Sequence, residues 1–256
     1  MSGRALILVY HSIEEGPPPL CIPPAVFRKH LDCLAEAKAR VVTLAALVDD
    51  LQAGRPLDTS VAITFDDGFQ SVIDQAAPLL AERRLPATVF CVAGHLGARN
   101  EFATQRGRVP VRPLANARSL ACLAVRGFDL GSHGMDHVPL AGASASVLER
   151  ELSYSRAVLE ATTGAQVRWF AYPYGVTPSA VGRAVVARTY DGACANPLRP
   201  VHPGADLFAL PRVDAHYLRR PALLRAVLEG VDSYLHIRRA AARLRRVLWA
   251  DFRLPT

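Results

Sequence analysis

The chain has 256 residues, half of them hydrophobic and about a fifth charged, which is enough for one domain with a sizeable core. The formal net charge of +7 rests almost entirely on arginine, because Lys29 and Lys38 are the only lysines. No hydrophobic run approaches the roughly 20 residues that cross a bilayer, which excludes a membrane-spanning helix within this sequence.

Strand-like hydrophobic runs alternate with Ala/Leu-rich helical segments, a pattern typical of α/β proteins with parallel strands. The predicted strands are residues 5–10, 61–65, 87–92, 127–132, 167–171 and 208–213. The predicted helices are residues 27–39, 77–84, 119–125 and 145–162, and residues 41–51 form a further strand and helix. Residues 99–113 are rich in Arg and are predicted to be a surface excursion.

Polar residues follow five of the predicted strands. In a barrel of parallel strands, catalytic groups gather at the carboxyl ends of the strands, because the loops there are free to vary. The sequence therefore predicts one common site at this rim.

The segment Thr64-Phe65-Asp66-Asp67-Gly68 places two adjacent carboxylates at the end of a hydrophobic strand. Such carboxylates are costly to bury unless a cation or strong hydrogen-bond donors compensate them. The simpler interpretation is a turn, since Asp and Gly are common turn residues. Adjacent residues of a straight strand point to opposite faces, so both carboxylates can reach one site only if the chain turns at Gly68.

The segment Ser132-His133-Gly134-Met135-Asp136-His137 places two histidines four positions apart, a spacing that lets both imidazoles bind one metal ion. An isolated pair of this kind is more often incidental. Together with Asp67, however, the pair forms a set of two nitrogens and one oxygen. This set suits zinc first, with cobalt, nickel, manganese or iron as alternatives, and it leaves a coordination position open for water.

These motifs, in this order, resemble the polysaccharide deacetylases of the NodB-homology type, also called carbohydrate esterase family four. The resemblance covers residues 8 to about 216. It implies a distorted (β/α) barrel and a metal-dependent hydrolase that removes acetyl groups from N-acetylated sugars. It also implies that Asp66 is the general base and that Asp67, His133 and His137 bind the metal.

Phe170-Ala171-Tyr172-Pro173-Tyr174-Gly175 resembles the third family motif, which forms one wall of the groove. The resemblance assigns Pro173 and Tyr174 to the substrate side, with the Tyr174 backbone N–H helping to hold the oxyanion. Many family members carry an Arg just before this Pro-Tyr pair to orient the base, whereas this chain has Ala171 and Tyr172 there. Arg212 is a candidate for the missing cation against Asp66, and a surface arginine is an equally weighted alternative.

The family's usual general acid is a histidine in a late Leu-x-His motif, which has no clean copy here. Leu8-Val9-Tyr10-His11 resembles the arrangement in poly-N-acetylglucosamine deacetylases, in which the motif order is permuted and an early histidine is the acid. We therefore favour His11 over His216 as the general acid, with a structural role for His11 as the alternative.

The C-terminal segment is strongly basic, with nine arginines against three acidic residues between 219 and 253. We divide the chain into a deacetylase-like domain, residues 1–218, and a basic amphipathic helical segment, residues 219–256, with one helix over 221–249. This helix either covers the barrel with a solvated basic face, which we favour, or lies on an anionic membrane surface.

Five cysteines without a C-x-x-C pair fit reduced thiols, and residues 5–10 are interpreted as a first strand rather than a signal peptide. We therefore expect a cytoplasmic protein, with peripheral membrane contact as an open alternative.

Two other functions remain as alternatives. A catalytically inactive carbohydrate-binding relative would explain the irregular third motif, although the Asp67, His133 and His137 set argues against it. A nucleic-acid-binding protein would explain the basic segment, but aromatic residues are sparse and no reading motif accompanies the charge, so no nucleic-acid partner is expected. The expected partner is an N-acetylated sugar or glycan.

Overall fold

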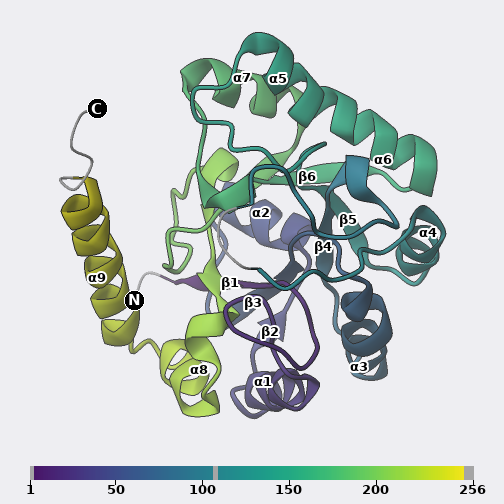
Figure 1. Cartoon of the computed structure of the whole chain (residues 1–256). Coiled ribbons are helices and arrows are strands. Elements are labelled where there is room, and N and C mark those ends of the chain that lie inside the picture. The colour runs from purple at the N-terminus through teal and green to yellow at the C-terminus, as the bar shows by residue number, and fades with distance from the viewer. Residues whose placement is uncertain (1–2, 106–108, 251–256) are drawn as a thin grey trace.

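The computed structural model describes residues 3–105 and 109–250, with side chains described up to residue 241. It is a barrel of parallel strands with helices on its outside (Figure 1). The strands are β1 (Ala5–Tyr10), β2 (Arg40–Val41), β3 (Ser60–Phe65), β4 (Thr88–Cys91), β5 (Asp129–Ser132), β6 (Val167–Ala171), β7 (Gly192–Ala195), β8 (Leu210–Pro211) and β9 (Val213–Asp214). The helices are α1 (Pro24–Glu36), α2 (Leu44–Gln52), α3 (Ala77–Glu82), α4 (Ala117–Val125), α5 (Ala145–Glu149), α6 (Ser155–Thr163), α7 (Ala180–Thr189), α8 (Pro221–Leu228) and α9 (Ser233–Ala250). The predicted α/β barrel class is confirmed.

The strand order is β8-β7-β6-β5-β4-β3-β1-β9, with β2 paired to the first residues of β3. The two ends of this order lie on one short segment, residues 210–214. Its first two residues pair with β7 and its last two pair with β1, and every pairing in the sheet is parallel. Arg212 is the single residue between them, so the residue that separates the two pairings lies where the barrel closes.

Strands β1 and β3 are buried along their whole length, because one face of a barrel strand packs against the surrounding helices and the other fills the barrel interior. Successive side chains of β1 enter two different core clusters. Leu6 and Leu8 pack toward the outer helices, whereas Ile7 joins Phe90 and Trp169 on the other face of the sheet. This alternation follows from the two-residue period of a strand and explains why residues 5–10 are continuously hydrophobic.

The predicted helix over residues 145–162 is interrupted by a π-helical turn, Arg150–Tyr154, that joins α5 to α6. A second π-helical turn, Val72–Ala76, precedes α3. Such turns widen a helix by one residue and are frequent at functional sites. The strand β7 and the helix α7 were not predicted. Strand β7 consists of Gly, Ala and Cys and has none of the β-branched or aromatic residues typical of strands.

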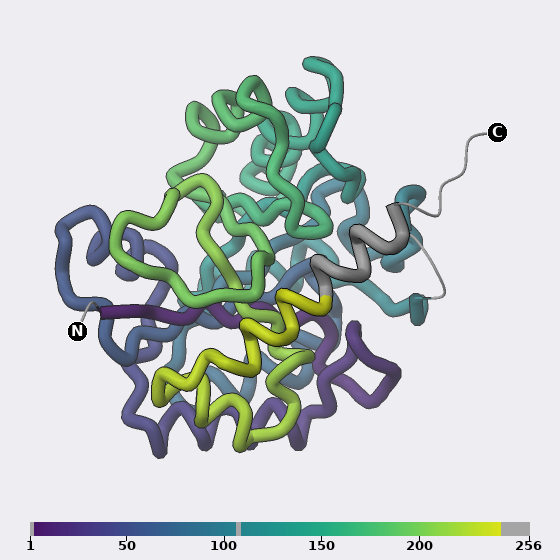
Figure 2. Tube along the Cα trace, turned by 90° about the vertical axis from the view of Figure 1, so that its left-hand side faces the viewer, coloured from purple at the N-terminus to yellow at the C-terminus, as the bar shows by residue number. Residues whose placement is uncertain are grey.

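The C-terminal segment does not form the single helix predicted over residues 221–249. It divides into α8 and α9, because Gly230 adopts a positive φ of 97° between them. Helix α8 packs against α1, and its Leu224 and Val227 are fully buried in the main core cluster. The start of α9 lies on the side of the molecule opposite α3 and α4 (Figures 1 and 2). The division at residue 218 and the membrane contact stay predictions.

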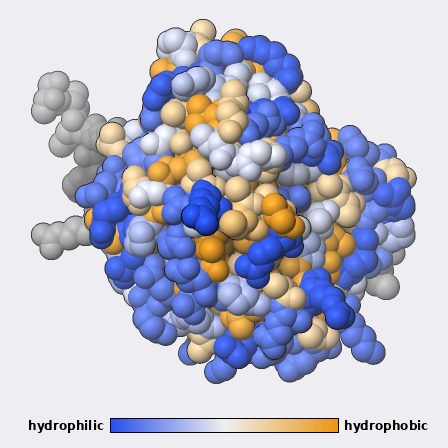
Figure 3. Space-filling model, turned by 90° about the vertical axis from the view of Figure 1, so that its right-hand side faces the viewer, coloured by the Kyte–Doolittle hydropathy of each residue, from blue (hydrophilic) through white to orange (hydrophobic). Residues whose placement is uncertain are grey.

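The surface that carries α3, α4 and α6 is mostly hydrophilic, with hydrophobic residues in smaller patches (Figure 3). All five cysteines are unpaired, and four of them are buried. Within the described residues, no helix combines the length and the hydrophobicity needed to cross a membrane.

Candidate active site

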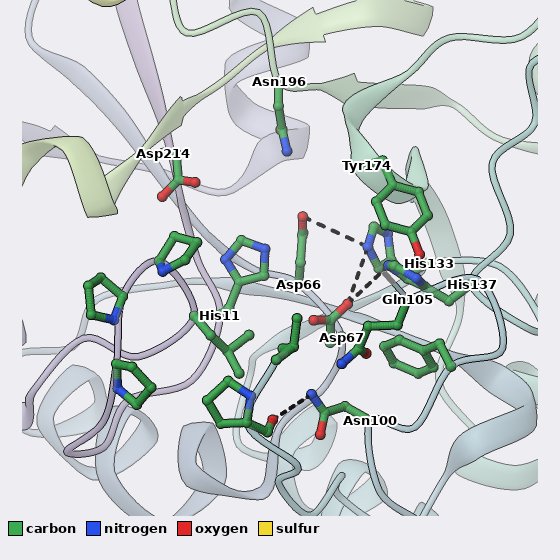
Figure 4. Close-up of a pocket in the computed structure, with 17 residues that line it drawn as sticks. His11, Asp66, Asp67, Asn100, Gln105, His133, His137, Tyr174, Asn196 and Asp214 are labelled. Carbon is green, nitrogen blue, oxygen red and sulfur yellow. Dashed lines mark hydrogen bonds and ion pairs between the residues drawn. The ribbon is translucent and has the colours of Figure 1, made fainter. Parts of the chain in front are cut away.

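A pocket of about 340 Å³ contains most of the residues that the sequence assigned to catalysis (Figure 4). Its walls come from the carboxyl ends of several barrel strands and from residues 17–20, 100–105 and 109–110. The lining residues are His11, Pro17, Pro18, Pro19, Leu20, Asp66, Asp67, Asn100, Phe102, Gln105, Val109, Pro110, His133, His137, Tyr174, Asn196 and Asp214. Of the predicted site residues, only Pro173 and Arg212 are not on this wall.

The chain turns immediately after β3, and this turn brings both aspartates to the pocket. Asp67 has a φ of 67° and Gly68 a φ of 75°. A Cβ on Gly68 would also lie 3.2 Å from the Cys91 sulfur, so the second left-handed position favours glycine. Because the backbone reverses here, Asp66 and Asp67 both line the pocket, as the sequence required.

Asp66 forms a buried, two-pronged ion pair with Arg212. The Arg212 Nη1 and Nη2 atoms donate to the two Asp66 oxygens at 2.7 and 2.6 Å, and Nε donates to Asn196 Oδ1 at 2.8 Å. Arg212 is 0% exposed and Asp66 is 1% exposed, so Arg212 is not a surface arginine. Its place at the closure of the barrel aims the guanidinium directly at the end of β3.

The charge of Asp66 is set by this pair. Burial by itself would raise its pKa, but the Arg212 charge, with a contribution from His133, lowers the pKa to about 2. The carboxylate is therefore ionised at neutral pH even though it is almost inaccessible to solvent.

Asp67, His133 and His137 form a second cluster beside Asp66. The Asp67 Oδ1 atom lies 3.5 Å from His133 Nε2 and 3.4 Å from His137 Nε2, and all three residues are buried. Ligands about 2.0–2.1 Å from one tetrahedral ion stand about 3.4 Å apart, so these separations fit a bound zinc ion. Burial lowers the pKa of His137 to about 4, which keeps its imidazole neutral, the form that binds metal.

A buried carboxylate forms hydrogen bonds with the backbone of the loop that carries both histidines. Glu151, 1% exposed and located on the π-helical turn, accepts hydrogen bonds from the backbone N–H groups of Met135 at 2.9 Å and Asp136 at 3.1 Å. A Cβ at Gly134 would lie 2.5 Å from Glu151 Oε2, so only glycine fits there. Glu151 therefore fixes the loop between the two metal-ligand candidates.

The third motif forms a tight turn after β6. Pro173 begins the turn, and Tyr174 has a φ of 59°. The Tyr174 ring is 44% exposed and stands with its edge toward His137, at a centroid separation of 4.8 Å. It thus forms one wall of the pocket beside the histidine cluster (Figure 4).

The two candidates for the general acid lie in different surroundings. His11 follows β1 and lines the pocket with Asp66 and Asp214 (Figure 4). His216 lies on a short 3₁₀ turn, is not among the pocket residues, and has a pKa lowered by burial. The placement favours His11, and its role stays a prediction.

Comparison with known proteins places this site in a family. Residues 53–192 match the family model described as polysaccharide deacetylase. The chain belongs to this family. The match confirms the resemblance inferred from the motifs and includes Asp66, Asp67, His133, His137 and Tyr174.

Individual relatives are distant. YxkH of Bacillus subtilis is 26% identical over 170 residues, covering 66% of this chain and 56% of that protein. The poly-β-1,6-N-acetyl-D-glucosamine N-deacetylase of Staphylococcus epidermidis is 26% identical over 196 residues, covering 73% of this chain and 65% of that protein. The chain therefore spans less than two thirds of either protein.

Among solved structures, IcaB from Ammonifex degensii superimposes with a TM-score of 0.72 at 23% sequence identity. The superposition covers 88% of this chain and 98% of that structure. At this identity the likeness supports the barrel fold.

Sequence reasoning missed five residues of this deacetylase-family site, namely Phe102, Thr104, Glu151, Asn196 and Asp214. Asp214 directly follows the predicted strand of residues 208–213, but no role was assigned to it. Phe102 and Thr104 lie in the segment interpreted as a surface excursion, and Phe102 is only 6% exposed. A phenylalanine within an Arg-rich segment was the signal that could have revealed them, because large aromatic residues are often buried.

Proposed function

We propose that this chain is a metal-dependent N-deacetylase that hydrolyses the acetamido group of an N-acetylhexosamine in a glycan, glycolipid or glycosylated precursor. The observation that carries this proposal is that one pocket holds an ionised, buried Asp66 beside the Asp67, His133 and His137 cluster. Amide hydrolysis requires a base that is ionised at neutral pH and electrostatic stabilisation of the oxyanion. Similarity to the poly-β-1,6-N-acetyl-D-glucosamine N-deacetylase of Staphylococcus epidermidis supports an N-acetylated glycan as substrate.

In this proposal, Asp67, His133 and His137 hold a divalent ion, with zinc expected first and cobalt, nickel, manganese or iron as alternatives. When bound, such an ion would polarise the acetyl carbonyl and lower the pKa of water at the site. The two histidines and the single carboxylate would leave a position free for substrate and water.

The chain's own residues then carry the proton transfers. Asp66 accepts a proton from the water as its oxygen bonds to the acetyl carbon, and Arg212 keeps the Asp66 carboxylate ionised and aligned. The backbone N–H of Tyr174 donates to the developing oxyanion, a contribution of about 3 kcal/mol in comparable sites. His11 gives a proton to the nitrogen as the C–N bond breaks, since an unprotonated amine anion is a very poor leaving group. The products are acetate and the free amino sugar.

The proposal is tested by acetate release from β-1,6-linked N-acetylglucosamine oligomers and from N-acetylated sugar precursors. Protein treated with chelator is assayed before and after reloading with zinc, cobalt or nickel. We expect release only after reloading, and none from Asp67→Ala. Asp58→Asn, which removes an exposed carboxylate remote from the pocket, is the matched control and retains activity.

Glycan binding without acetate release, in protein that holds a stoichiometric metal ion, would instead support the inactive carbohydrate-binding relative. Release that is unaffected by chelation and by Asp67→Ala would remove the metal from the proposal.

A further inference from the structure

The two histidines of the proposed metal site are oriented in different ways. The His133 ring is fixed by a hydrogen bond between Nδ1 and the backbone carbonyl oxygen of Ala171, at 2.7 Å. This is the usual arrangement, in which the second ring nitrogen of a metal-binding histidine has a hydrogen-bond partner. His137 Nδ1 is buried and has no such partner in the part of the chain that the structure describes. Other contacts must therefore orient the His137 ring.

Two aromatic rings enclose the His137 imidazole. Phe102 stacks on one face, with ring centroids 4.4 Å apart and an angle of 24° between the ring planes. Tyr174 meets the imidazole at 66°, with centroids 4.8 Å apart. Together, these contacts restrict the rotation of the ring about its side-chain bonds.

The hydroxyl group of Thr104 forms hydrogen bonds with both His137 and Tyr174. Thr104 Oγ1 donates to the backbone oxygen of His137 at 2.8 Å and lies 2.9 Å from the Tyr174 hydroxyl. Thr104 has a single O–H, so the Tyr174 hydroxyl is the donor in the second bond. His137 and Tyr174 both have positive φ, 56° and 59°, a conformation that side chains rarely adopt without support. Thr104 thus connects two of the left-handed residues of the site, His137 and Tyr174.

We propose that Phe102 and Thr104 are positioning residues that hold His137 in its metal-binding orientation. The segment of residues 102–104 then contributes to the metal centre, and its Phe102 also lines the pocket. This inference rests on the proposed function, because it requires that the cluster bind a metal ion.

The test measures the zinc affinity of the full chain by competition with a chromophoric chelator. We expect Thr104→Val and Phe102→Leu to weaken zinc binding by about 10- to 100-fold, the usual effect of removing residues that orient a metal ligand. Thr104→Ser keeps the hydroxyl and Phe102→Tyr keeps the aromatic ring, so both variants should bind zinc with nearly wild-type affinity. The melting temperature of each metal-free variant reports separately on the fold.

Phe128→Leu is the matched control, because Phe128 is buried to a similar extent, 7% exposed, but is not among the pocket residues. We expect this variant to lower the melting temperature and leave the zinc affinity unchanged. Wild-type affinity in both Thr104→Val and Phe102→Leu would overturn the inference and leave the proposed function intact. If the wild-type chain binds none of zinc, cobalt, nickel, manganese or iron, both the inference and the metal-dependent function are wrong.

Discussion

The buried carboxylates on the two sides of the pocket have different partners. On one side, the negative charge of the buried Asp66 is balanced by the guanidinium of Arg212, which lies in the segment that closes the barrel. On the other side, Asp67 faces His133 and His137, and burial keeps at least His137 neutral. The two adjacent carboxylates therefore differ in how their charge is compensated. Asp66 is paired with a cationic side chain, whereas Asp67 has no cationic partner among the described residues.

This difference indicates how one turn can provide two functions. An isolated buried carboxylate is strongly disfavoured, so its negative charge must be compensated either by a cationic side chain or by a bound metal ion. The Arg212 pair suits a residue that has to stay ionised and accept a proton. The Asp67 cluster suits a residue that binds an ion from solution. The following predictions separate these roles.

Exchanging the two carboxylates for amides gives the largest expected effect. Asp66→Asn should lower kcat by about 10²- to 10⁴-fold while the chain keeps its zinc, because the base is lost and the Asp67, His133 and His137 cluster is unchanged. Asp67→Asn should lose zinc and turnover together. Zinc content measured by mass spectrometry, together with acetate release, checks both. The opposite pattern of zinc loss would mean that the two roles are exchanged.

Removing the Arg212 cation should destabilise the fold. Arg212→Met leaves the Asp66 carboxylate buried without its partner, at a cost of about 3–5 kcal/mol at neutral pH. Denaturant unfolding of the metal-free chain measures this cost. Asp66→Asn combined with Arg212→Met removes both charges, so the double variant should recover part of the lost stability.

The pH dependence of this destabilisation sharpens the comparison. In the wild-type chain the pKa of Asp66 is about 2, below its ordinary value of 3.8, so the pair stabilises the fold above pH 4, and this contribution is lost as the pH falls toward 2. In Arg212→Met, burial raises the pKa of Asp66 instead. The stability gap between the two chains should therefore narrow as the pH is lowered from 7 to 4. A gap that does not change with pH would mean that Arg212 acts through packing alone.

The assignment of the general acid predicts a difference between two histidines. His11→Asn should lower kcat by about 10²-fold with little change in zinc affinity, because His11 lines the pocket outside the metal cluster. His216→Asn should leave kcat near the wild-type value. Steady-state kinetics on the same substrate compares them, and a larger loss from His216→Asn would contradict the assignment.

The smallest of these effects is expected at Glu151. Glu151→Gln keeps the shape of the side chain but replaces an acceptor oxygen with a donor facing the backbone N–H groups of Met135 and Asp136. The resulting loss of order in the metal-ligand loop should weaken zinc binding by about 10-fold. Glu149→Gln, an exposed position two residues away, is the control and should bind zinc normally. Equal affinities would restrict Glu151 to a structural role.

Most strands and the residues of the three motifs could be predicted from the sequence, because hydrophobic runs and polar strand ends are local features. Strand β1 has the predicted bounds, and Asp66, Asp67, His133 and His137 meet in one pocket. The short β7 and the division of the C-terminal segment into α8 and α9 were not predicted. Strand β7 contains only Gly, Ala and Cys and lacks the β-branched and aromatic residues typical of strands. The helix break did have a local signal, Gly230 followed by Asp232 and Ser233, which the prediction of a single helix overlooked.

The sequence by itself determined the family, the order of the motifs and the identity of the candidate metal ligands, because these depend on residue type and spacing. Only the tertiary structure decided how each group is held. Arg212 reaches Asp66 across 146 positions because the chain closes the barrel there, and Phe102 and Thr104 reach His137 from a loop without regular structure. Such contacts depend on barrel closure and loop packing, which join residues that no local pattern connects.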